Sequence, residues 1–128
     1  MKLDNIVVAG VSLPIPAGWR KAESTESYVG KEGLLDPRVG DLKDNNEIER
    51  IRHELERFGG TMDSVVLQGR PCVRTRYNRD GASIRTYSID LGGGWELRAV
   101  YVFRAGNEAV VAAVAAQLES DAAMSGES

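Results

Sequence analysis

Apolar and polar residues alternate along residues 7–15, the first clear pattern in the chain. A period of two is typical of a strand with one buried face, so the pattern predicts one long N-terminal strand. Pro14 has no backbone N–H to donate, which predicts that this end of the strand lies at a sheet edge or leaves the sheet. The apolar positions are Val7, Ala9, Val11, Leu13 and Ile15.

The stretch that follows, PAGW, has the composition of a turn. Pro16 restricts φ and Gly18 is free to take a positive φ, so we expect the chain to reverse here. Trp19 would then cover one end of the core, an interpretation we prefer to the alternative of an exposed residue that binds a partner. Two cations, Arg20 and Lys21, follow directly.

Residues 22–43 are weakly patterned and interrupted by residues that break regular structure. We interpret them as a loop, with a short strand at Tyr28 and Val29. The interrupting residues are Gly30, Gly33, Pro37 and Gly40.

Residues 44–58 have the strongest helical pattern. Asp44 is a good N-cap, and Glu47 three residues later completes a capping box. Gly59 and Gly60 are suited to end the helix in a left-handed conformation. The apolar stripe consists of Ile48, Ile51, Leu55 and Phe58, at spacings of three and four.

Three consecutive strands are predicted between residues 64 and 103. They cover 64–77, 82–91 and 95–103, joined by a hairpin turn at Asp80–Gly81 and by a run of three glycines. Strands joined by such short turns form an antiparallel meander.

A second helix is predicted at 106–120, capped near Asn107. Its apolar stripe contains Val111, Val114 and Leu118, and alanines that allow close approach to a sheet fill most of the rest. We expect the remaining residues, 121–128, to form a flexible C-terminal tail.

Helices that do not alternate with strands indicate the α+β class. The expected fold is an antiparallel β-sheet, made of the long N-terminal strand and the C-terminal three-strand meander, with two α-helices packed on it. The length of 128 residues suits one domain, which we place at residues 1–120.

The chain resembles the PsbP-like α+β domains, which include DcrB-type bacterial proteins, actinobacterial LpqN-type lipoproteins and a Ran-binding import factor. The resemblance spans roughly residues 5–120 and is carried by VSLPIPAGW, LQGRPCVRTRY, GGGWELRAVYVF and NEAVVAAVAAQLES. It implies binding to other proteins, as in the chaperone-like DcrB-type members, and no catalysis. The lipidated N-terminal cysteine of the lipoproteins has no counterpart near the start of this chain, so lipid anchoring is not carried over.

Composition narrows the function classes. A net charge of −3 gives no bulk attraction to nucleic acid or to an anionic membrane. The single cysteine cannot form an internal disulfide. We find neither a signal-peptide pattern nor a spanning segment of about 20 apolar residues, so a cytoplasmic location is expected.

The usual catalytic residue types are sparse. His53, the only histidine, points away from the apolar helix stripe and is interpreted as a surface residue. Cys72 lies between two arginines that would activate a thiol, but we favour a small buried residue. Carboxylates seven apart on the first helix fit a solvated charge ladder better than a glycosidase pair. We therefore expect no enzyme, no metal and no cofactor.

Arginine is concentrated in the middle of the chain. Residues 70–104 hold seven arginines and three acidic residues, a local net charge of +4. On alternating strands, Arg74, Arg76, Arg85 and Arg98 are expected to gather on one sheet face. That face would recognise an acidic protein or a phosphate, or would be a plain solvated face paired with Asp90 and Glu96.

The hypothesis that follows is a non-catalytic protein-binding module, acting as a small adaptor, chaperone or immunity-type protein for a partner such as a secreted effector or toxin. The alternative is a structural subunit of a larger assembly, such as a secretion or injection apparatus or a phage particle. Neither nucleic acid nor a membrane is an expected partner. The candidate contact residues are Trp19, Arg20, Lys21, Arg74, Arg76, Arg85 and Arg98.

Overall fold

The computed structural model describes residues 2–42 and 46–125, which form nine strands and two helices. In chain order these are β1 (Leu3–Val8), β2 (Val11–Pro16), β3 (Arg20–Lys21), β4 (Tyr28–Gly30), β5 (Gly33–Asp41), α1 (Asn46–Phe58), β6 (Thr61–Leu67), β7 (Arg70–Arg79), β8 (Ala82–Gly92), β9 (Trp95–Phe103) and α2 (Glu108–Ser125).

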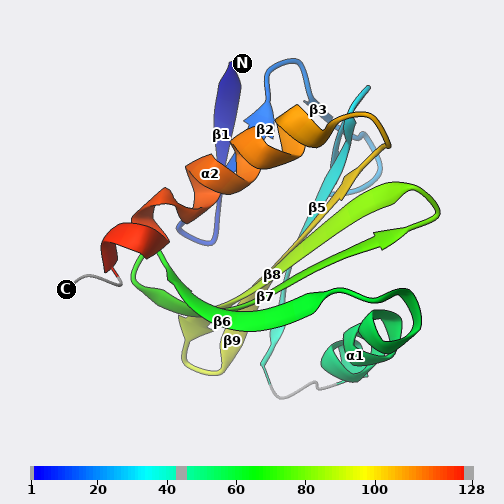
Figure 1. Cartoon of the computed structure of the whole chain (residues 1–128). Helices are drawn as coiled ribbons and strands as arrows, with labels where there is room; N and C mark the ends of the chain where they lie inside the picture. Colours follow the sequence, from blue (N-terminus) through cyan, green and yellow to red (C-terminus); the bar gives the residue numbers. More distant parts are fainter. Residues whose placement is uncertain (1, 43–45, 126–128) are drawn as a thin grey trace.

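Seven strands form one antiparallel sheet in the order β3-β4-β5-β9-β8-β7-β6, and β1 pairs with β2 in a separate hairpin. Helix α2 and the hairpin lie over one face of the large sheet, here called the inner face (Figure 1). Helix α1 lies at the other side, the outer face, near one end of β7. The α+β class with an antiparallel sheet is confirmed, although the strands are arranged differently from the prediction.

The predicted long N-terminal strand is wrong, because the chain turns back at Ala9 and Gly10. Both have positive φ, 50° and 79°, as a two-residue hairpin turn requires. The turn pairs Val8 with Val11. A two-residue turn pairs residues of opposite parity, so Ile6 and Val8 share the face of Val11, Leu13 and Ile15. Val7, predicted on that face, is 73% exposed. Residues 6–8 are all apolar, so periodicity alone did not reveal the change of face.

The segment read as a loop contains the nine-residue strand β5, which lies between β4 and β9. Leu35 on this strand is fully buried. Pro37 is tolerated because β4 extends only as far as the Leu35 pairing, so β5 is an edge strand at Pro37 and needs no N–H on that side.

The meander has four strands, because the predicted strand 64–77 is a hairpin of β6 and β7. Gln68 and Gly69 make its turn, with φ of 49° and 76°. The Gln68 side chain also accepts from the Ser12 N–H (3.0 Å) and donates to the Ser12 carbonyl (2.9 Å). It therefore hydrogen-bonds to β2 much as a neighbouring strand would, and it joins the small hairpin to the large sheet.

The core lies between the inner face and the elements that cover it. The Tyr101 hydroxyl, fully buried, donates to the Pro14 carbonyl on β2 (2.9 Å). Its ring stacks on Phe103, with centroids 5.8 Å apart. The stripe predicted for the second helix is buried on this side. The core side chains include Val11, Leu13, Ile15, Leu35, Tyr87, Ile89, Leu97, Tyr101, Phe103, Val111, Val114 and Leu118.

The two helices lie close to their predicted positions. Helix α1 ends at Phe58, and Gly59 follows with a φ of 76° and donates its N–H to the Leu55 carbonyl (2.9 Å). The predicted N-cap Asp44 lies outside the described residues. Helix α2 extends to Ser125, beyond residue 121 where the tail was expected to begin.

Trp19 is a core residue, only 7% exposed, as the preferred interpretation predicted. Its ring centroid is 6.0 Å from that of Phe103, and its Nε1–H donates to Glu32 (3.3 Å). The alternative role of Trp19 as an exposed contact residue is therefore wrong. Gly30 leaves the space that the indole fills, since a Cβ there would lie 2.0 Å from the ring.

We expect Gly30→Ala to destabilise the fold by about 1–3 kcal/mol, because the added methyl group overlaps the indole ring of Trp19. Urea unfolding followed by tryptophan fluorescence measures the change. Gly40→Ala is the matched control, since a Cβ there meets nothing within 4 Å. Equal unfolding midpoints for the two variants would contradict the proposed packing of Trp19.

Candidate functional site

The sheet register brings three of the predicted arginines together. Arg76 lies directly opposite Arg85, and Arg74 lies opposite Tyr87, so these side chains share the inner face. This part of the prediction is confirmed. The same face carries the apolar core, so these arginines of β7 and β8 lie beside core residues, on the side of the sheet that α2 covers (Figure 1).

Arg98 does not join them, and that prediction is wrong. Arg98 pairs with Ser88, which pairs with Val73, so all three belong to the outer face. Its guanidinium binds Glu96 on the same strand. The strand register decides the face, and alternation within each strand cannot supply the register between strands.

Arg74 is bound to two carboxylates. Its guanidinium forms a bidentate pair with Asp63 on β6, including an Nε–Oδ1 hydrogen bond of 2.9 Å, and a second ion pair with Glu119 on α2. The hydrogen bond from Arg74 lowers the pKa of Asp63. Because Arg74 is only 17% exposed and joins three elements, its role is to tie α2 to the sheet.

Arg76 and Arg85 are different, because neither forms an ion pair with a carboxylate in the described ranges. Asp63 is within electrostatic range of Arg76, but its oxygens are bound by Arg74. The Nε of Arg85 is buried without a hydrogen-bond partner, as is the Tyr87 hydroxyl. Like charges directly opposite on neighbouring strands destabilise a sheet.

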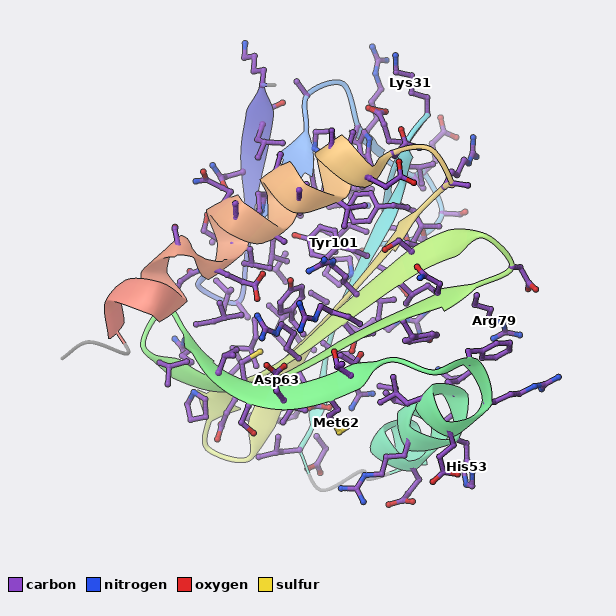
Figure 2. All side chains as sticks on the ribbon, viewed as in Figure 1. Lys31, His53, Met62, Asp63, Arg79 and Tyr101 are labelled. Carbon is purple, nitrogen blue, oxygen red and sulfur yellow. The ribbon has the colours of Figure 1, made fainter. Side chains whose placement is uncertain are left out.

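Two adjoining hollows open at this place. One, of about 440 Å³, extends over Arg76 toward Phe58 at the end of α1. The other, of about 320 Å³, reaches Arg104 and the first turns of α2. They share Asn78, Ser83 and Arg85, and together we call them the arginine mouth. Figure 2 shows nitrogen-bearing side chains gathered between α2 and the sheet, beside the labelled Asp63.

Arg20 and Lys21 lie apart from this cluster. They form β3, at the opposite end of the strand order from β6 and β7. Both are exposed, and the Lys21 ammonium lies 3.9 Å from Glu26 and donates to the Thr25 carbonyl (3.1 Å). The structure therefore does not bring these two cations together with the arginines of the inner face.

The other candidate residues occupy ordinary structural positions. Cys72 is buried, and desolvation raises the pKa of its thiol to about 12, so it is not an activated nucleophile. His53 is an exposed side chain whose Nδ1 lies 3.9 Å from Glu56. Among the residues that the structure describes, no three His, Cys, Asp or Glu side chains are grouped to hold a metal ion.

Sequence reasoning missed the residues that complete the site. Asp63 and Glu119 bind Arg74 from elements 11 and 45 residues away. Arg104 was counted in the basic zone but was not a candidate. Its position just after β9, next to the start of α2, was the signal that could have placed it at the same end of the sheet as Arg85.

Comparisons with protein-family models, with curated proteins and with solved structures each find no match to this chain. The resemblance to PsbP-like domains stays a prediction. Neither helix, over its described residues, is long and apolar enough to cross a membrane.

We expect Asp63→Asn to lower stability at pH 7, because the ion pair with Arg74 is lost. The pKa of Asp63 is depressed in the folded state, so its contribution is present above the unfolded value of about 3.9 and disappears as pH falls through the folded pKa. The stability difference from wild type should shrink as the pH is lowered from 5 to 2.

Urea unfolding at each pH measures this difference. Asp4→Asn is the control, since Asp4 is exposed and has no ion pair with any described residue. A difference between wild type and Asp63→Asn that stays constant down to pH 2 would refute the stabilising role of the carboxylate.

Proposed function

We propose that the chain is a non-catalytic binding module for a protein partner, and that the arginine mouth contacts acidic groups of that partner. It would act as a small adaptor, chaperone or immunity-type protein. The predicted resemblance to PsbP-like domains also implies binding to other proteins. Of the seven candidate residues, Arg76 and Arg85 are the two retained at the proposed contact, and Arg104 is added to them.

The observation that carries the proposal is the pairing of Arg76 with Arg85. Two guanidinium groups face each other on neighbouring strands, half-buried, without an acidic partner in the described chain. This arrangement costs stability, and local violations of this kind are typical of functional sites. An acidic group from outside would convert the repulsion into charge-assisted hydrogen bonds.

The open shape of the site suits a side chain presented by a partner protein. The two hollows, of about 440 and 320 Å³, both open to solvent. Phe58 and Tyr77 line the first hollow from its outer-face side and give it an apolar part. A protein surface that inserts one acidic residue would use both the charge and this apolar rim.

The alternative function, a subunit of a larger assembly, is favoured by a different feature. Strand β6 is the last strand of the sheet and pairs only with β7. A two-residue turn makes Leu67 and Arg70 a hydrogen-bonded pair, so the backbone groups of Ser64 and Val66 point to the open edge. An open edge of this length can pair with another chain.

Oligomeric state separates the two proposals. If β6 mediates assembly, light scattering after size-exclusion chromatography should show oligomers for the wild type and monomers for Ser64→Pro, which removes an outward N–H without breaking the β6–β7 ladder. A wild-type monomer at high protein concentration would contradict assembly through this edge and leave the binding module as the better account.

For the binding module, we expect Arg76→Glu/Arg85→Glu to abolish retention of the protein partner in affinity purification from the native organism. The reversal replaces two attractive charges with two repulsive ones, and pairs across an interface of this kind are worth several kcal/mol. Quantitative mass spectrometry of the retained proteins gives the ratio between wild type and variant.

The control variant is Lys2→Glu/Arg52→Glu, which changes net charge equally at two exposed positions outside the mouth. A partner recovered equally with wild type and the control, but lost with the mouth variant, supports the site. Equal recovery with all three proteins would show that the arginine mouth is not the contact.

A further inference from the structure

We infer that the acidic group received by the arginine mouth is a phosphoryl group carried on a side chain of the partner protein. This inference rests on the proposed function and specifies its ligand chemistry. It follows from the charge of the mouth and from the donors that its walls present.

The charge of the mouth exceeds what one carboxylate neutralises. Its lining contains three arginines, Arg76, Arg85 and Arg104, and one acidic residue, Glu108 at the start of α2. The guanidinium of Arg104 donates to the Lys31 carbonyl (3.3 Å), which leaves its charge uncompensated. The lining therefore carries a net charge of +2, which matches a phosphoryl group with a charge of about −1.5 to −2 at pH 7.

The hydrogen-bond donors of the arginine mouth also outnumber the two oxygens of a single carboxylate. Arg76 and Arg85 project from directly opposed positions, so their guanidinium groups can approach one ligand from two sides. Asn78 and Ser83, the next opposed pair on the same face, add an amide and a hydroxyl. A phosphoryl group has three strong acceptor oxygens and can use donors from several directions, whereas a carboxylate has two oxygens in one plane.

A buried atom marks the inner limit of this site. The Nε of Arg85 lies beneath the surface without a hydrogen-bond partner, and an unsatisfied buried donor of a charged group is costly. An anion that enters the mouth could accept from this nitrogen and from a terminal nitrogen of the same guanidinium, which is the fork geometry that arginine uses for phosphate. Arg74 cannot serve in this way because Asp63 and Glu119 hold it.

The test is an NMR titration of the 15N-labelled protein, read at the arginine Nε–Hε signals. The probes are a short Gly/Ala peptide with one central phosphoserine, the same peptide with glutamate, the same peptide with serine, and inorganic phosphate alone, all at equal ionic strength. We expect the phosphoserine peptide to shift the Arg85 Nε–Hε signal and to bind roughly tenfold more tightly than the glutamate peptide.

Two variants locate the binding. Arg85→Lys keeps the charge but removes the fork, and it should weaken phosphoserine binding several-fold more than glutamate binding. Arg52→Glu, on the exposed side of α1, should leave every titration unchanged. Because these variants change surface or half-buried side chains, their folding is checked from the remaining amide signals of the same spectra.

Each outcome decides between the proposals. Glutamate binding that equals or exceeds phosphoserine binding overturns the phosphoryl inference and leaves the acidic-partner function intact. Inorganic phosphate that binds as tightly as the phosphoserine peptide overturns a protein-borne source. If phosphoserine binds in the mouth but partner recovery does not depend on Arg76 and Arg85, the mouth has the inferred phosphoryl chemistry, but the proposed partner contact fails and with it the assignment of the phosphoryl group to that partner. If no probe shifts the Arg85 signal, the phosphoryl site is absent.

Discussion

The ion pairs of Arg74 join β6, β7 and α2 beside the apolar core. The core residues of the inner face lie on every strand from β5 to β6, and they pack with the hairpin and α2. Charged residues share this face on β7 and β8, and here Glu119 of α2 adds an ion pair to Arg74. Asp63 fixes the guanidinium from the other side. Apolar and charged residues therefore adjoin on the inner face, with the charged residues beside the core.

Arg76 and Arg85 form the next opposed pair on this face after Arg74 and Tyr87. They are half-buried and line the two hollows of the arginine mouth. Arg74 neutralises the two nearest carboxylates, so these acids are not available to the other two arginines. The ion pairs of Arg74 thus leave Arg76 and Arg85 without a carboxylate partner. Both arginines are partly desolvated, so their charges interact more strongly than they would in water.

The sequence allowed the helices, the Asp80–Gly81 turn and the faces of individual strands to be predicted, because each depends on local spacing. It did not reveal the turns at Ala9–Gly10 and Gln68–Gly69, because the apolar runs before them, 6–8 and 65–67, hide the change of buried parity and neither pair stands out by composition. Pro37 predicts a break in regular structure, but β5 is an edge strand at this position and tolerates it. For the site, Arg74, Arg76 and Arg85 were placed correctly, whereas Arg98 required the register between strands.

The hydrogen bonds of the N-terminal hairpin have a consequence for how the chain acquires its structure. Ser12 is held by Gln68, 56 residues away, and Pro14 by Tyr101, 87 residues away. During synthesis the hairpin therefore emerges long before β9 can receive it. Contacts of such high sequence separation slow folding, and Val11, Leu13 and Ile15 stay without their core partners in the meantime. The hairpin is thus made before β9 but docks only after it, and until then the nascent chain carries exposed apolar residues of the kind that chaperones bind.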